Sequence, residues 1–326
     1  MKKYKELLSI KPEDKVCIIA HIEPDADALS SMIVMREFLM QHLKVKCVDL
    51  FAEYGTLPET CLDILGSVKI NKNAKKYNCA IMMDSPSVER LGIYGVLFNN
   101  ANNKIIIDHH ATNQMCGNLN IVEFVSSTCE IVYKITKFFK YKLNKEQLGK
   151  LYAGIITDTN NLSVGNMNPL TFNIVSHASK EVDLKKIHAH FLRNTKLKNM
   201  QLLALAVENI VTFDAGKIIL THISHSEAEK YKAKFEHFTG IVNKLNEISE
   251  GELICFIYPN DNSYYVSMRC KEGYDVSSIA KKFSGGGHTC AAAFLSDKTL
   301  MQIEQDILVE FNKQLKFTKR KDTKIF

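Results

Sequence analysis

A short apolar segment that ends in one histidine and two aspartates is the feature of this chain that most restricts its fold. Val16–Ala20 predicts a buried strand, and His21 and Asp25 lie between it and a helical pattern of apolar residues that begins at Asp27. A strand-to-helix turn places such side chains at the carboxyl edge of an open α/β sheet, where ligands bind. For this segment alone, an ordinary helix start with Asp27 as the N-cap is the alternative.

Acidic and imidazole side chains occur at the ends of three more predicted elements. Asp84 closes the apolar run Cys79–Met83, Asp108–His110 closes Lys104–Ile107, and Asp158 ends a helical pattern. Each group alone could cap a turn, orient a loop or be a satisfied core residue. Parallel strands share one carboxyl edge, however, and several carboxylates crowded there repel one another unless cations neutralise them. The combination therefore predicts a metal site.

The order of the predicted elements favours an α/β fold. Near-continuous apolar strands alternate with helical patterns up to about residue 125, which is typical of a mostly parallel sheet with helices on both faces. The predicted strands are Val16–Ala20, Lys44–Phe51, Cys79–Met83, Lys104–Ile107 and Ile121–Phe124. Helical patterns then continue to residue 208, and a smaller, mixed α+β domain follows. We expect domains over 1–190 and 210–326, with a helical linker over 191–209.

Three consecutive glycines mark the second domain. Ser284 precedes them and His288 follows them, and Arg269 lies upstream on a predicted strand. A flexible turn is one interpretation of such a segment. The alternative is an anion site, because glycines let backbone N–H groups approach a ligand closely and both Arg269 and His288 could donate charge-assisted hydrogen bonds to a phosphate.

Composition is that of an ordinary globular chain. Of the 326 residues, 46% are hydrophobic and 24% charged, and the net charge of +6 allows an anionic ligand without requiring one. No apolar run approaches the roughly 20 residues of a membrane span, and the N-terminus has no apolar leader, so we expect a cytoplasmic location and no membrane partner. The nine dispersed cysteines include no CxxC pair, which favours reduced thiols over a disulfide framework or a zinc site.

Taken together, the motifs resemble those of a known family. They are His21-x-x-Pro-Asp25-x-Asp27, Asp84 within Met83-Asp-Ser-Pro, Asp108-His109-His110, Thr157-Asp158-Thr159, Ser267-x-Arg269 and Gly285-Gly-Gly-His288. In this order they are similar to those of DHH-family phosphoesterases with the associated C-terminal domain. The branch they resemble includes nanoRNases, pAp phosphatases and cyclic di-AMP phosphodiesterases.

The resemblance implies two divalent metal ions and a set of site residues. His21, Asp25 and Asp84 would hold one ion, and Asp27, Asp84, His109 and Asp158 the other. Catalytic roles fall to His110, which would face the scissile phosphate, and to Asp108, which would orient it. Substrate contacts fall to Ser267, Arg269, Gly285, Gly286, Gly287 and His288. Mixed imidazole and carboxylate ligands suit Mn²⁺ better than Mg²⁺.

The activity implied is hydrolysis of short nucleotides by a water activated between the two ions. Linear dinucleotides (nanoRNA), pAp and cyclic di-AMP are the expected substrates, and the residues do not rank them. An inorganic pyrophosphatase-like hydrolase and a non-catalytic nucleotide sensor are the alternatives. A homodimer is compatible with the resemblance. Four residues depart from the family pattern: Ser30, Asn160 and Ala293 stand where relatives often have glycine, and Ser284 precedes the triple glycine.

Overall fold

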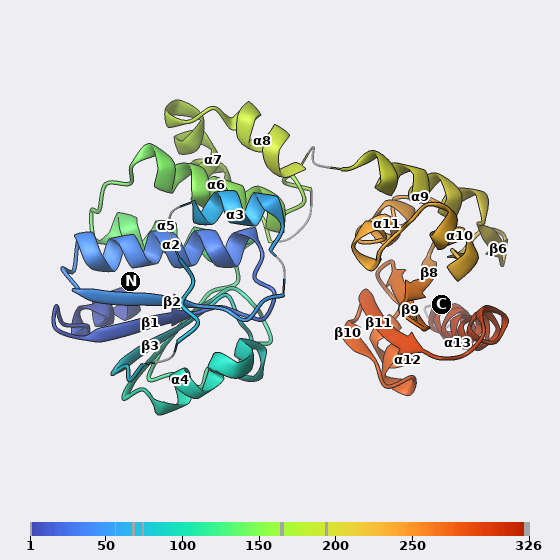
Figure 1. The fold of residues 1–326 in the computed structure, drawn as a ribbon, viewed down its shortest axis with the longest axis horizontal. Coiled ribbons are helices and arrows are strands. Elements are labelled where there is room, and N and C mark those ends of the chain that lie inside the picture. The colour runs from blue at the N-terminus through green and yellow to red at the C-terminus, as the bar shows by residue number, and fades with distance from the viewer. Residues whose placement is uncertain are drawn as a thin grey trace. The chain divides into compact units, whose positions relative to one another are not determined.

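A five-stranded parallel sheet forms the centre of the first part of the chain (Figure 1). Its strand order is β2-β1-β3-β4-β5. The strands are β1 (Lys15–Ile19), β2 (Cys47–Phe51), β3 (Cys79–Met83), β4 (Asn103–Asp108) and β5 (Leu119–Val122). All five were predicted, and the α/β fold class is confirmed. Because every strand runs in the same direction, the segments that follow β1, β3 and β4 emerge at one edge.

The computed structural model describes residues 2–55, 57–66, 69–73, 75–163, 166–192 and 195–322. The chain divides into two compact units, Met1–Asn194 and Thr195–Phe326. No helix within the described residues is long and apolar enough to cross a bilayer.

Helices cover both faces of the first sheet (Figure 1). One face carries α2 (Ala26–Gln41), α3 (Glu59–Leu65), α5 (Thr128–Phe138), α6 (Lys145–Asp158), α7 (Pro169–Glu181) and α8 (Leu184–Leu192). The other face carries η2 (Glu89–Tyr94) and α4 (Gly95–Asn100), and α1 (Lys2–Lys5) and η1 (Glu6–Ser9) precede β1. The sequence shows no sign of α4, because a helix of six residues is too short to show a helical period.

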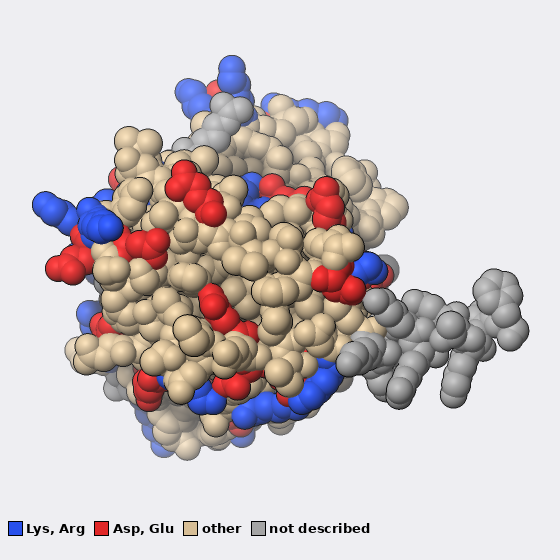
Figure 2. Space-filling model, turned by 90° about the vertical axis from the view of Figure 1, so that its right-hand side faces the viewer, with Lys and Arg blue, Asp and Glu red and all other residues tan. Residues whose placement is uncertain are grey.

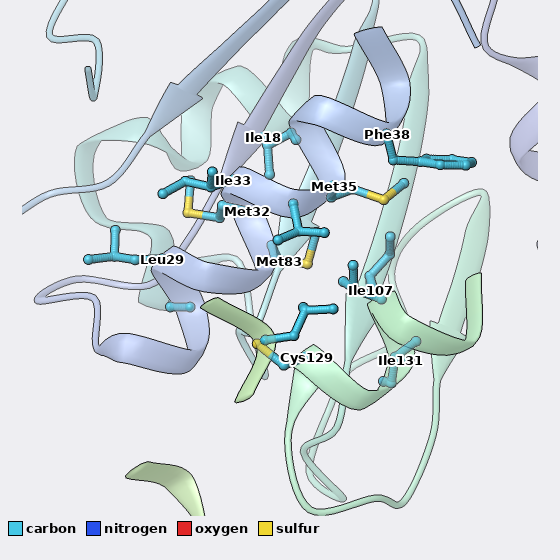
Figure 3. Packing of buried hydrophobic residues seen from close by; sticks show 14 of the residues in the cluster. Ile18, Leu29, Met32, Ile33, Met35, Phe38, Met83, Ile107, Cys129 and Ile131 are labelled. Carbon is cyan, nitrogen blue, oxygen red and sulfur yellow. The ribbon is translucent and has the colours of Figure 1, made fainter. Parts of the chain in front are cut away.

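The helix α2 lies at the centre of the main hydrophobic core. Its apolar residues are buried on nearly all sides, because the sheet lies beneath it and α5 and α6 pack alongside. Figure 3 shows this packing, with labelled side chains from α2 (Leu29, Met32, Ile33, Met35 and Phe38), from the strands (Ile18, Met83 and Ile107) and from α5 (Cys129 and Ile131). Each such side chain contributes about 1.5–3 kcal/mol when fully buried, so the start of α2 is held on a rigid support.

The second unit is built on a six-stranded mixed sheet in the order β10-β11-β9-β8-β7-β6. The strands are β6 (Val211–Phe213), β7 (Ile218–His222), β8 (Leu253–Asn260), β9 (Ser263–Cys270), β10 (Gly286–His288) and β11 (Ala291–Ser296). Only the β7–β8 pair is parallel. Gly286–His288 forms a short edge strand paired with β11, so the flexible turn that was one interpretation of these glycines is not observed.

Two layers of helices enclose the second sheet. One face packs against α9 (Leu197–Glu208), α10 (His225–Lys230), η3 (Phe235–His237) and α11 (Ile241–Leu245). The opposite face packs against α12 (Val276–Lys282) and α13 (Leu300–Asp322). The sequence pattern over 226–237 predicts a single helix, which is wrong, since α10 ends at Lys230 and η3 is a separate turn.

Candidate metal centre and substrate site

Imidazole and carboxylate groups from four segments meet at the carboxyl edge of the first sheet. His21 follows β1, Asp84 follows β3, His109 follows β4, and Asp158 ends α6. The Nε2 atom of His21 lies 3.9 Å from Asp84 Oδ2 and 4.0 Å from Asp25 Oδ2. His109 Nε2 lies 3.5 Å from both Asp84 Oδ1 and Asp158 Oδ2. Residues distant in the sequence therefore form one cluster.

Three overlapping groups of side chains in this cluster could each hold a metal ion. They are His21, Asp25 and Asp84; Asp27, His109 and Asp158; and Asp84, His109 and His110. The first two groups have no residue in common, and the third connects them because it contains Asp84 from the first and His109 from the second.

The two histidines are oriented by backbone carbonyls. The Nδ1 atom of His21 lies 2.8 Å from the carbonyl oxygen of Ile22, and that of His109 lies 3.2 Å from the oxygen of Val125. When Nδ1 donates to these oxygens, the Nε2 lone pair is directed into the cluster. Metal-ligating histidines are commonly held in this way.

The spacing of these atoms fits divalent cations. The Nε2-to-oxygen separations of 3.5–4.0 Å are too long for good hydrogen bonds. Two ligand atoms each about 2.1 Å from one ion lie no more than about 4.2 Å apart. The cluster thus combines neutral imidazoles and carboxylates at the separations that a shared ion requires.

Asp27 is held by the start of α5, which sequence reasoning missed. The backbone N–H groups of Thr128 and Cys129 donate to its two carboxylate oxygens at 2.7 and 3.0 Å, and the Thr128 hydroxyl donates to Asp84 Oδ1 at 2.7 Å. Asp27 therefore caps α5, whereas α2 is capped by Asp25, which accepts from Ala28 N at 3.0 Å. The alternative that Asp27 is the N-cap of its own helix is wrong.

The electrostatics of the cluster favour added positive charge. Burial raises the pKa of Asp27 well above its usual range, and the charge of Asp84 adds to the shift. Burial likewise raises the pKa of Asp84, aided by Asp25 and opposed by His109. Burial raises the pKa of Asp158 to about 7. Each shift shows that the ionised form is disfavoured in the protein alone, and a bound cation would reverse this.

His110 also forms a hydrogen-bonded pair with Asp108. Its Nδ1 lies 2.8 Å from Asp108 Oδ1, and Asn113 Nδ2 donates to the other oxygen of this fully buried carboxylate at 2.7 Å. Burial alone would raise the pKa of Asp108, but these hydrogen bonds outweigh it and hold the pKa below its usual value. Burial favours the neutral His110 ring, yet Asp108 raises the pKa of His110 to about 8.

Two backbone features bring the ligands together. Asp84 has a left-handed backbone with a φ of 54°, which is uncommon outside glycine and is maintained only where surrounding structure enforces it. In α6, a Cβ atom on Gly154 would lie 2.5 Å from Cys129 Sγ and 3.0 Å from Asp27 Oδ1. Glycine at this position therefore lets α6, which carries Asp158, approach α2.

The predicted substrate residues of the second unit come together on one side of its sheet. Ser267 and Arg269 are two residues apart on β9, so their side chains point to the same side of the sheet. Ser267 pairs with Ala293 of β11, and Arg269 pairs with Ala291. On its other edge, β11 pairs with β10, and there Gly286 is the partner of Ala293. Arg269 is held by its own hydrogen bonds, from Nε to Asn243 Oδ1 (3.0 Å) and from Nη1 to the Met268 oxygen (2.8 Å).

The three glycines have different environments. A Cβ on Gly285 or Gly287 would overlap the backbone of β11, whereas one on Gly286 would meet nothing within 4 Å. Because Gly286–His288 pairs with β11 along one edge, its outer edge and the side of Gly286 where a Cβ would lie are open to a ligand. The side chain of His288 lies outside the described residues.

Comparisons with known proteins agree with this architecture. A family model described as the DHH family, N-terminal domain, matches residues 15–156, and one described as the DHHA1 domain matches residues 216–316. A probable bifunctional oligoribonuclease and PAP phosphatase NrnA from Streptococcus mutans is 28% identical over 315 residues, covering 95% of this chain and 98% of that protein. The NrnA of Bacillus subtilis is 26% identical over 284 residues, covering 86% of this chain and 88% of that protein.

A solved structure shows the same fold. An exopolyphosphatase-related protein from Bacteroides fragilis superimposes with a TM-score of 0.84 at 21% sequence identity, covering 98% of this chain and 95% of that chain. The likeness therefore extends through both units of the chain.

Proposed function

The chain belongs to the DHH family of phosphoesterases, which are hydrolases, and we propose that its substrates are short nucleotides. The bonds cleaved would be the phosphodiester of a linear dinucleotide or cyclic di-AMP, or the phosphomonoester of pAp. Support comes from the relatives of similar length, which are named oligoribonuclease and PAP phosphatase. The observation that carries the proposal is the meeting of His21, Asp25, Asp27, Asp84, His109 and Asp158 at one sheet edge.

Divalent cations are the proposed cofactors of this cluster. We assign His21, Asp25 and Asp84 to one ion and Asp27, Asp84, His109 and Asp158 to a second, with Mn²⁺ as the preferred metal because the ligands mix nitrogen and oxygen. When bound, such ions activate water and neutralise the charge that develops on a phosphate.

The pair formed by His110 and Asp108 has a proton-holding role in this proposal. With a pKa of about 8, the His110 ring is protonated near neutral pH, and Asp108 fixes its Nδ1 so that Nε2–H is free to donate. A donor at this position would stabilise negative charge on a phosphate oxygen. Asp108 itself is shielded from solvent and acts through His110.

The second unit would bind a further group of the substrate. Arg269 offers a guanidinium held in place by Asn243, and Ser267 and the open side of Gly286 lie on the same side of the sheet. Charge-assisted bonds from arginine suit a terminal phosphate. Figure 2 shows one face of the molecule on which acidic and basic side chains are interspersed over a largely uncharged surface.

The test is a hydrolysis assay with Mn²⁺ that compares a linear dinucleotide, pAp and cyclic di-AMP, with product identification. We expect release of mononucleotide from at least one of them, and a loss of activity by orders of magnitude in Asp84→Asn. Asp49→Asn is the matched control, because Asp49 lies in β2 and hydrogen-bonds Tyr77 and Asn71 instead of joining the cluster. Tight nucleotide binding without turnover at saturating Mn²⁺ would indicate a sensor, and near-normal activity of Asp84→Asn would refute the metal assignment.

A further inference from the structure

Two cysteines lie opposite each other next to the proposed substrate residues, one at the end of β9 and the other just before β11. Arg269 pairs with Ala291 in the antiparallel register of β9 and β11, so the next residues outward, Cys270 and Cys290, are directly opposite. A backbone hydrogen bond from Cys270 N to Cys290 O, 3.1 Å long, continues the ladder at this position. The two side chains therefore lie on the same side of the sheet.

The separation of opposed residues suits a disulfide. Cα atoms of directly opposite residues in antiparallel strands lie about 4.5–5.5 Å apart, and disulfides span Cα separations of roughly 4.4–6.8 Å. Cys290 lies in the turn between β10 and β11, and a turn can absorb the small approach that bond closure needs.

The two thiols differ in accessibility. Cys270 is buried, and its sulfur lies 3.5 Å from the carbonyl oxygens of Tyr274 and Thr289. Burial raises the pKa of Cys270 to about 12. Cys290 is exposed, as is Cys116. An oxidant in solution can therefore reach Cys290 first.

We propose that Cys270 and Cys290 are a redox modification site, which a small disulfide such as glutathione disulfide converts reversibly into an intramolecular disulfide. The Cys290 sulfur attacks one glutathione sulfur, the glutathione S–S bond breaks, and the released glutathione takes the Cys290 proton. The Cys270 sulfur then attacks Cys290, and the second glutathione leaves with the Cys270 proton. Two protein thiols are oxidised while one disulfide is reduced to two glutathione thiols.

The expected consequence rests on the proposed function. Arg269 immediately precedes Cys270, and Gly286–His288 is connected to Cys290 through Thr289. A covalent bond at this point would tether the β10–β11 turn to the end of β9. We therefore expect the oxidised protein to show a several-fold higher KM for a dinucleotide, with kcat changed little because the metal cluster belongs to the other unit.

The experiment exposes the full chain to glutathione disulfide, blocks remaining thiols and identifies linked peptides by mass spectrometry. We expect a Cys270–Cys290 peptide, the loss of two titratable thiols and full reversal by dithiothreitol. Cys270→Ser should instead accumulate glutathione on Cys290, and Cys290→Ser should give no linked peptide. Cys116→Ser is the matched control, since it removes an exposed cysteine and should leave the link intact.

Glutathione on Cys116 without any Cys270–Cys290 peptide in the wild-type chain would overturn the proposal. An equal KM for the oxidised and reduced proteins would overturn the effect on binding. Absence of hydrolysis by the reduced protein would refute the proposed function while leaving the disulfide result in place, so the two failures can be told apart.

Discussion

Among single residues, Thr128 has the most specific connection to the cluster, because it donates hydrogen bonds both to Asp27 in the first turn of α2 and to Asp84 after β3. We expect Thr128→Val to keep the backbone bond to Asp27 but to remove the hydroxyl bond to Asp84. Loss of such a supporting hydrogen bond typically lowers metal affinity roughly 10- to 100-fold. A Mn²⁺ titration followed by electron paramagnetic resonance measures this directly, without relying on activity.

The control for Thr128 lies on the same helix. Thr136 is also buried, but its hydroxyl donates to the Tyr133 carbonyl within α5, so Thr136→Val should leave Mn²⁺ affinity unchanged. Thr128→Ser retains a hydroxyl and should bind Mn²⁺ nearly as well as the wild-type chain. Equal affinities of Thr128→Val and Thr136→Val would show that the hydroxyl does not position Asp84.

The sequence could predict which acidic and imidazole residues come together, but not what holds them. Asp84 and His109 follow apolar strands, and parallel strands place their ends side by side, so local pattern and topology suffice. Thr128 and Gly154 gave no such signal, because their roles depend on packing against Asp27, which is far away in the chain. Nothing near either residue in the sequence indicates that partner.

At the level of the secondary-structure element, two glycines in α6 should respond in opposite ways to the same change. Gly154→Ala would force a Cβ against Cys129 and Asp27, and we expect a loss of about 1–3 kcal/mol in the free energy of unfolding. At Gly149 the nearest atom would be Ile187 Cδ1 at 3.5 Å, an ordinary contact, so Gly149→Ala should gain up to about 1 kcal/mol. Denaturant unfolding of both variants tests this, and losses of equal size in the two would contradict it.

The end of α12 offers a second prediction for an element. Ser284 has a left-handed φ of 60°, and the N–H groups of Ser284 and Gly285 donate to the carbonyls of Lys281 and Ala280, as in a Schellman motif. A left-handed backbone costs non-glycine residues roughly 1–2 kcal/mol, and glycine adds some entropy cost in the unfolded chain. We expect Ser284→Gly to raise the free energy of unfolding by about 0.5–1 kcal/mol.

Ser249→Gly provides the comparison for Ser284→Gly. Ser249 is an exposed loop residue whose φ is outside the left-handed region, so glycine there should lower the free energy of unfolding slightly. If Ser284→Gly also lowered the free energy of unfolding, backbone strain at Ser284 would not determine the stability of this variant. The left-handed φ of Ser284 is one that glycine adopts without steric cost, and the same holds for Asn160, whose φ is 45°.

Short elements were the part of the fold that could not be predicted. The strand β10 is made of two glycines and a histidine, residues with no strand signal, and it forms because β11 supplies a partner. The helix α4 is stabilised by burying Leu97 and Phe98 against the sheet and not by its own sequence. In both cases tertiary packing outweighs local propensity.

For the molecule as a whole, the crowded carboxylates make stability depend on pH and metal. The pKa of Asp158 is about 7 in the folded, metal-free protein and about 3.9 in an unfolded chain. Protonation therefore favours the folded state, and this stabilisation is complete below about pH 4 and is lost as the pH rises through about 7. Burial also raises the pKa values of Asp27 and Asp84, so their protonation stabilises the folded state in the same direction.

We expect the Tm of chelator-treated protein to fall by several degrees between about pH 5 and pH 7.5. Saturating Mn²⁺ should remove most of this decline, because bound cations compensate the ionised carboxylates. Differential scanning calorimetry at several pH values, with and without metal, provides the measurement. Asp158→Asn has one less group to ionise, so its chelated form should show a shallower decline, and an unchanged slope would rule out Asp158 as a contributor.

The bond between Asp27 and the start of α5 also has a consequence for the order of folding. The two partners are separated by 101 residues, so the carboxylate is not in place until α2 and α5 have docked on the same sheet. Contacts of such long range form late and slowly. High-affinity cation binding should thus be absent from partly folded chains, and during refolding it should appear together with the last phase of core formation in the first unit.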